Sequence, residues 1–126
     1  MPKVLVIEDE PSIRRMLRFS LRDAGFDIIE LTTGAEAVRF LATSSPEAVI
    51  LDLDLADGLA GAVLELLRRP EGNNSSHPAW VMLSALDLEE AVGRYGPLEH
   101  HFLRKPFDPW NLLGVLEQLL AEKEGV

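Results

Sequence analysis

Short apolar runs alternate with segments of helical periodicity along this chain, and the alternation repeats about five times. The runs are residues 4–7, 28–31, 48–53, 80–83 and the weaker 102–103. Near-continuous hydrophobicity of this kind is typical of strands that are covered on both faces of a sheet. Strands that alternate with helices form βαβ units, whose strands run parallel. The pattern therefore predicts an α/β fold built on one parallel sheet.

The segments between the apolar runs carry the signals of helix ends. In the first segment, Leu17 and Leu21 fall on one helical face, and Gly25 is a natural stop. Two pairs further along have the spacing of a capping box: Thr33 with Glu36, and Asp87 with Glu90. The predicted helices cover residues 11–24, 34–43, 59–68, 87–94 and 109–122. Residues 69–78 are rich in turn formers and are predicted to form a loop.

Composition narrows the class of protein. The 126 residues are 47% hydrophobic and 26% charged, which fits a single compact domain over residues 1–126. Cysteine is absent, so disulfides and thiolate metal sites are excluded, and the cytoplasm is the expected setting. A net charge of −9 opposes direct contact with nucleic acid or an anionic membrane. No apolar run approaches the ~20 residues of a membrane-spanning helix.

Polar side chains stand where the predicted strands end. In an open parallel α/β sheet, ligands bind outside the carboxyl ends of the strands. The residues at those ends are acids, a hydroxyl and a lysine: Glu8, Asp9 and Glu10 after the first strand, Asp52 and Asp54 at the third, Ser84 at the fourth, and Lys105 with Pro106 after the fifth. These groups are therefore expected to converge on one edge of the sheet.

Such a cluster suits phosphoryl chemistry assisted by a divalent cation. Clustered carboxylates repel one another, and burying them costs several kcal/mol unless a cation compensates. Mg²⁺ or Mn²⁺ fits a set of oxygen ligands, and a lysine and a hydroxyl suit phosphoryl oxygens. Asp52 is the candidate nucleophile. Taken singly, the residues have plainer roles: Glu8, Asp9 or Glu10 as helix caps, and Lys105 as a surface lysine.

Four motifs at these strand ends are similar to those of one family over nearly the whole chain. They are Val6-Ile7-Glu8-Asp9-Glu10, Val49-Ile50-Leu51-Asp52-Leu53, Met82-Leu83-Ser84-Ala85 and Leu103-Arg104-Lys105-Pro106-Phe107. The chain resembles the receiver domains of two-component response regulators. The resemblance implies a flavodoxin-like (βα)5 fold, a doubly wound parallel sheet with the strand order 2-1-3-4-5.

The resemblance also implies a phosphoacceptor and a metal site. Asp52 would take a phosphoryl group from the phosphohistidine of a sensor histidine kinase or phosphotransfer protein. Asp9, Asp52 and the backbone carbonyl of Asp54 would bind the metal, and Glu8 would act through metal-bound water. A module of this kind catalyses only its own phosphorylation and dephosphorylation and is otherwise not an enzyme.

Switching would follow from residues near the phosphoryl group. By the same resemblance, Lys105 and the Ser84 hydroxyl bind phosphoryl oxygens, and a cis peptide bond to Pro106 presents the lysine. Movement of Ser84 would shift the loop before the fourth helix, and Phe102 would turn inward. The fourth helix, fifth strand and fifth helix would then form the face that meets an output domain or protein partner.

Two segments depart from the family pattern. Ala56 and Asp57-Gly58 stand where a proline and then a glycine are common, which leaves the geometry of that loop open. His100-His101 stand where part of the family has a pair of acids. Neighbouring residues of a strand point to opposite faces, so two surface or edge histidines are favoured over a metal site.

The role of the Asp54 side chain is left open by the sequence, and two alternative functions are also possible. A carboxylate beside the phosphoryl group is expected to shorten the life of phosphorylated Asp52, unless Asp54 points into solvent. Asp52-Leu53-Asp54 also echoes the nucleophile and acid of phosphatases that resemble the haloacid dehalogenase family, where the pair normally ends the first strand. A pseudo-receiver, an interaction module that is not phosphorylated, would be expected to lack a site residue, and none is missing.

Overall fold

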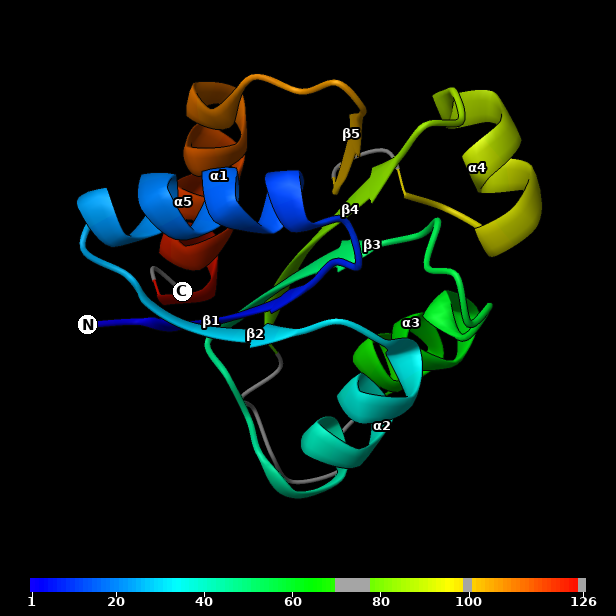
Figure 1. The fold of residues 1–126 in the computed structure, drawn as a ribbon, viewed down its shortest axis with the longest axis horizontal. Helices are drawn as coiled ribbons and strands as arrows, with labels where there is room; N and C mark the ends of the chain where they lie inside the picture. Colours follow the sequence, from blue (N-terminus) through cyan, green and yellow to red (C-terminus); the bar gives the residue numbers. More distant parts are fainter. Residues whose placement is uncertain (70–77, 99–100, 125–126) are drawn as a thin grey trace.

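The computed structural model describes residues 1–69, 78–98 and 101–124, which form five parallel strands in the order β2-β1-β3-β4-β5 (Figure 1). The strands are β1 (Lys3–Ile7), β2 (Asp27–Leu31), β3 (Ala48–Asp52), β4 (Ala79–Ser84) and β5 (Phe102–Arg104). The helices are α1 (Pro11–Asp23), α2 (Gly34–Thr43), α3 (Ala60–Arg68), α4 (Leu88–Tyr95) and α5 (Pro109–Glu124). The predicted fold class and strand order are confirmed, and the ends of elements differ from the predicted ones by at most two residues.

The sheet lies between two layers of helices (Figure 1). α1 and α5 pack on one face, and α2, α3 and α4 line the other. Successive side chains of a strand point to opposite faces. In β1, Val4 and Val6 therefore join the core beneath α1 and α5, whereas Leu5 and Ile7 join the core on the other face. Because both faces are covered, the strands are apolar throughout.

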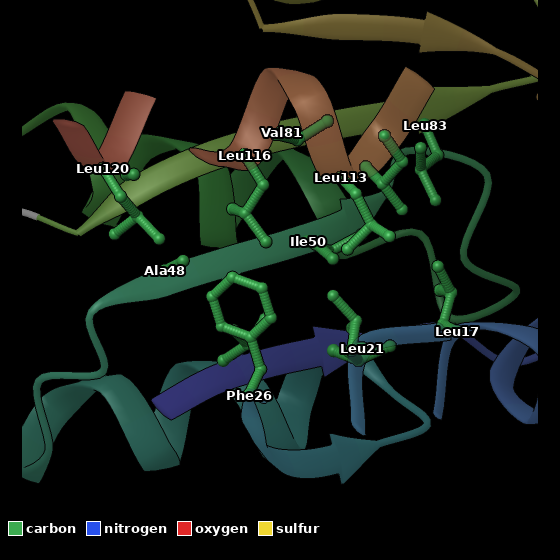
Figure 2. Close-up of a cluster of buried hydrophobic side chains, with 14 residues drawn as sticks. Leu17, Leu21, Phe26, Ala48, Ile50, Val81, Leu83, Leu113, Leu116 and Leu120 are labelled. Atoms are coloured by element: carbon green, nitrogen blue, oxygen red, sulfur yellow. The ribbon is translucent and has the colours of Figure 1, made fainter. Parts of the chain in front are cut away.

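Figure 2 shows the core between the sheet and the layer of α1 and α5. Leu17 and Leu21 of α1 and Leu116 of α5 are completely buried there, together with Ile50 of β3. Full burial of one such side chain contributes about 1.5–3 kcal/mol relative to exposure. This packing fixes the helices against the sheet and so fixes the strand ends from which the polar residues project.

Some of the predicted loop and one of the two neighbouring histidines lie outside the described residues. Residues 70–77 of the predicted loop and His100 lie outside them. His101 is half-buried and stacks on Trp80 with ring centroids 3.9 Å apart, and its Nδ1 lies 2.9 Å from the Trp80 carbonyl oxygen. These contacts fit a packed edge histidine better than a metal ligand. Within the described ranges, no helix has the length and apolar content that crossing a bilayer requires.

The loop between β3 and α3 is tied to the start of α2. Asp57 Oδ2 accepts a hydrogen bond from Ala35 N at 3.1 Å, and its Oδ1 accepts one from Leu59 N at 3.1 Å. Gly58 has a φ of 72°, a left-handed conformation that glycine adopts without strain. A Cβ added to Gly34 would lie 2.6 Å from Leu59 Cβ. The loop and α2 can therefore meet only because residue 34 lacks a side chain.

Gly34→Ala is expected to destabilise the fold, because the added methyl group would meet Leu59. Overpacking of this kind costs about 1–3 kcal/mol. The matched control is Gly114→Ala in α5, where an added Cβ meets nothing within 4 Å. Alanine in that helix interior should stabilise by roughly 0.5–1 kcal/mol. Urea unfolding measures both free energies, and equal changes in the two variants would contradict the steric account.

Candidate functional site

The carboxyl ends of β1 and β3 bring three carboxylates together. The two strands pair with Ile7 opposite Leu51, so the residues that come next, Glu8 and Asp52, are also neighbours. Glu8 is 0% exposed and Asp52 is 1% exposed. One carboxylate oxygen from each of Glu8, Asp9 and Asp52 lies within 4.8 Å of the others. The structure thus brings these three acids to one edge of the sheet.

Lys105 lies against two of these carboxylates. Its Nζ is 3.1 Å from Asp52 Oδ1 and 3.2 Å from Glu8 Oε1. Its backbone N–H donates to the carbonyl oxygen of Ser84 at 2.8 Å, which ties the segment after β5 to the end of β4. The peptide bond between Lys105 and Pro106 is cis, as the resemblance implied.

Burial and charge determine the protonation of this cluster. The pKa of Glu8 is raised to about 7, first by burial and then by the adjacent carboxylate of Asp52 and its negative charge. For Lys105, burial alone would lower the pKa, but the close negative carboxylates of Asp52 and Glu8 outweigh it, so the pKa is raised. One lysine does not neutralise three carboxylates, and burial together with the neighbouring Asp52 charge favours the protonated form of Glu8.

The arrangement of the acids fits a hard divalent cation. Glu8 Oε1 is buried and has no hydrogen-bond partner among the described residues, although Lys105 Nζ lies 3.2 Å away. The other oxygen, Oε2, accepts a hydrogen bond from Glu10 N at 3.1 Å. A buried oxygen without a hydrogen bond is costly. Because hard cations prefer carboxylate oxygens, the three acids could hold such an ion.

Asp9 and Glu10 stand before α1 without capping it. Asp9 Oδ2 accepts a hydrogen bond from Ala56 N at 2.8 Å and so joins the end of β1 to the loop after β3. Glu10 occupies the N-cap position of α1, but its side chain makes no capping bond and accepts instead from Ser12 Oγ at 3.0 Å. The predicted side-chain cap at Glu10 is therefore wrong. Short side chains cap helices best, because their oxygen stays close to the first free N–H groups.

Sequence reasoning missed one contact at this site. Ser84 is 0% exposed, and its hydroxyl donates to Asp54 Oδ1 at 2.8 Å. Asp54 Oδ2 accepts from Ala85 N at 2.7 Å, and the Asp54 N–H donates to Asp52 Oδ1 at 2.8 Å. The Asp54 carboxylate therefore does not simply point into solvent. Asp52 pairs with Leu83 in the sheet, so extending that register by two residues would have set Asp54 beside Ala85.

The two residues expected to switch lie near α4, Ser84 at the loop before it and Phe102 at the core beneath it. Ser84 Oγ accepts a hydrogen bond from Leu86 N at 3.0 Å, which links it to the loop before α4. Phe102 lies opposite Met82 in the sheet and is half-buried against the core beneath α2, α3 and α4. A displacement of Ser84 would therefore be transmitted to that loop.

A family profile and individual known proteins both match this chain. The family profile described as response regulator receiver domain matches residues 4–117. Transcriptional regulatory protein KdpE of Mycobacterium tuberculosis is 37% identical over 107 residues, which cover 85% of this chain and 46% of that protein. DNA-binding transcriptional regulator NtrC of Escherichia coli is 30% identical over 120 residues, which cover 94% of this chain and 24% of that protein. The chain thus spans less than half the length of these two relatives.

The solved structures agree with the sequence comparison. The structure of chemotaxis response regulator CheY4 of Vibrio cholerae matches with a TM-score of 0.77 and 26% identity, covering 94% of this chain and 98% of that chain. The receiver domain of Francisella response regulator 1452 matches with a TM-score of 0.79 and 25% identity, covering 97% of this chain and 98% of that chain.

A divalent cation is expected to stabilise the fold, because it would relieve the repulsion among Glu8, Asp9 and Asp52. A ligand at ten times its dissociation constant adds about 1.4 kcal/mol. Asp9→Asn should lose most of this gain, whereas Glu65→Gln, which removes an exposed acid of α3, should keep it. Thermal unfolding with and without MgCl₂ measures the gain. An equal gain in Asp9→Asn and the parent would exclude Asp9 as a ligand.

Proposed function

Because this chain belongs to the response regulator receiver domain family, we propose that Asp52 accepts a phosphoryl group from the phosphohistidine of a sensor histidine kinase or phosphotransfer protein. One observation carries the proposal. Asp52 is 1% exposed, lies 3.1 Å from Lys105 and shares a cluster with Glu8 and Asp9. Burying charges in this way costs stability, so a chemical role explains the arrangement better than packing does.

Asp52 would act as the nucleophile of the transfer. One of its oxygens attacks phosphorus, the bond from phosphorus to the donor's histidine nitrogen breaks, and that nitrogen keeps the electron pair. Asp9, Asp52 and the backbone carbonyl of Asp54 would hold Mg²⁺ or Mn²⁺, and Glu8 would act through metal-bound water. When bound, the cation supplies charge neutralisation for the phosphoryl oxygens.

Ser84 would couple the site to the output face. Together with Lys105, its hydroxyl would bind phosphoryl oxygens and offset their charge. Because Leu86 N donates to the Ser84 hydroxyl at 3.0 Å, a shift of Ser84 would move the loop before α4. Phe102 would turn inward, and the surface of α4, β5 and α5 would change. A partner that prefers one arrangement then biases the equilibrium by its differential affinity.

The remaining features of the proposal concern setting and partners. Residues 1–126 would act in the cytoplasm as one receiver domain that catalyses only its own phosphorylation and dephosphorylation. The net charge of −9 argues against direct contact of this segment with nucleic acid or an anionic membrane. KdpE and NtrC are named as transcriptional regulators. An output domain or separate protein partner is accordingly proposed for the face formed by α4, β5 and α5.

The two alternatives have less support. A phosphatase that resembles the haloacid dehalogenase family would carry its aspartate pair at the first strand, whereas Asp52 ends β3 and Asp54 follows it. A pseudo-receiver that is never phosphorylated would be expected to lack part of the site, and Asp9, Asp52 and Lys105 are all in the sequence.

Acetyl phosphate with Mg²⁺ is expected to phosphorylate one site, and Asp52→Asn should abolish the reaction. The control Asp57→Asn removes a carboxylate from the loop after β3 but leaves the acidic cluster unchanged, so this variant should still be phosphorylated. Chelation of the metal should also stop labelling, because uncompensated carboxylates repel the anionic donor. Intact-mass spectrometry measures the product. Labelling that persists in Asp52→Asn would refute the assignment.

Ser84→Ala is expected to leave phosphorylation of Asp52 largely intact but to uncouple it from α4, because the hydroxyl senses the phosphoryl group and does not attack it. Amide chemical shifts with and without beryllofluoride measure the coupling, and those of α4 should move severalfold less than in the parent. Ser12→Ala removes an exposed hydroxyl near the site and serves as the control. Undiminished movement of the α4 resonances in Ser84→Ala would exclude the coupling.

A further inference from the structure

Both oxygens of the Asp54 carboxylate are bonded to the chain at the end of β4. Oδ1 accepts from the Ser84 hydroxyl at 2.8 Å, and Oδ2 accepts from the Ala85 N–H at 2.7 Å. At the same time, the Asp54 N–H donates to Asp52 Oδ1 at 2.8 Å. Asp54 therefore contacts the proposed phosphoacceptor with its backbone and the loop between β4 and α4 with its side chain.

These two donors cannot serve two anions at once. A serine hydroxyl carries one hydrogen and a backbone amide carries one, and at Ser84 and Ala85 both are directed to Asp54. Hydrogen bonds to an ionised acceptor are roughly twice as strong as neutral ones. A phosphoryl group on Asp52 would compete for the same hydroxyl, and its negative charge would repel the Asp54 carboxylate. One of the two anions must give up the donors.

We propose that the Asp54 side chain is an internal competitor of the phosphoryl group. It holds Ser84 and Ala85 in the unphosphorylated protein and releases them when Asp52 is phosphorylated. This inference rests on the proposed function at Asp52 and deepens it. Release is feasible because Asp54 is an exposed residue, whereas Asp52 and Ser84 are buried. A carboxylate that turns into water recovers its hydration. Asp54 is thus a positioning residue, since it acts through Ser84 and Ala85.

Ser84 and Asp87 also hold the loop before α4 through hydrogen bonds. Ser84 Oγ accepts from Leu86 N at 3.0 Å, and the Asp87 side chain caps α4 by accepting from Glu90 N at 2.9 Å. Hydrogen bonds therefore link Ser84 to Leu86 and Asp87 to the first turn of α4, and Asp54 joins Ser84 to the segment after β3. Loss of the Asp54 contact frees Ser84 to approach the phosphoryl group, and the loop follows.

The affinity of the whole chain for beryllofluoride with Mg²⁺, titrated by ¹⁹F NMR, tests the proposal. Asp54→Ala removes both acceptors and is expected to bind about tenfold more tightly than the parent, which corresponds to about 1.4 kcal/mol. Asp54→Asn keeps one acceptor oxygen without the charge and should fall between the two. Asp57→Asn removes a carboxylate of the same loop that contacts Ala35 and Leu59 instead, and it should match the parent.

Two further readouts separate positioning from a merely structural effect. The Ala85 amide proton should resonate downfield in the ligand-free parent, shift upfield in Asp54→Ala and return when beryllofluoride binds. In a Ser84→Ala background, the gain in affinity from Asp54→Ala should shrink, because the two residues act through one contact. Phosphorylated Asp52 should also decay severalfold more slowly in Asp54→Asn and Asp54→Met than in the parent.

The outcomes that overturn the proposal are distinct. Equal affinity for beryllofluoride in the parent, Asp54→Asn and Asp54→Ala would exclude competition. An Ala85 resonance that Asp54→Ala leaves in place would exclude the contact itself. Failure of the proposed function would give another result, since neither the parent nor any variant that keeps Asp52 would bind beryllofluoride, and the competition would fall with it.

Discussion

Glu8 and Asp52 are almost completely buried at neighbouring strand ends, and Lys105 contacts both of them. The parallel sheet forces this arrangement, because Ile7 of β1 pairs with Leu51 of β3, so that Glu8, just after β1, lies beside Asp52, the last residue of β3. Taking carboxylates out of water costs several kcal/mol each, and attraction to one lysine returns only part of that cost. Burial and the adjacent Asp52 carboxylate also raise the pKa of Glu8 to about 7. The rest of the fold must supply the stability that keeps these charges together.

That stability comes from the two apolar cores on the faces of the sheet. Well-packed interiors deform little, so a change at the site is expected in the loops after the strands. The loops after β3 and β4 are held by different contacts. The loop after β3 is held by Asp9, through Ala56, and by Asp57, through the start of α2. The loop after β4 is joined to the segment after β3 by the bonds of Ser84 and Ala85 to Asp54, a contact between donors and an anion that a phosphoryl group is proposed to replace.

The sheet and the convergence of the acids could be predicted because both depend on backbone periodicity. Apolar runs define the strands, and parallel strands deliver Glu8, Asp9 and Asp52 to one edge. The partners of individual side chains could not be predicted in the same way. The contacts of Asp54 depend on the register of two strand ends and on side-chain torsions that sequence order does not encode. At Glu10, the residue occupies the N-cap position as expected, but its long side chain bonds elsewhere.

In the exchange proposed for Asp54, phosphorylation replaces one anion at the Ser84 and Ala85 donors with another. The hydrogen bonds to these donors are then present in both states. Their contributions to the free energies of the two states largely cancel, so the free-energy difference between the states is small. Two states separated by a few kcal/mol are both populated, and a partner shifts them by its differential affinity. Without a carboxylate at position 54, the donors would gain their anion only on phosphorylation, and the switch would be biased toward that state. On this proposal, Asp54 would keep the unphosphorylated state competitive and would leave the balance to a partner at the proposed face of α4, β5 and α5.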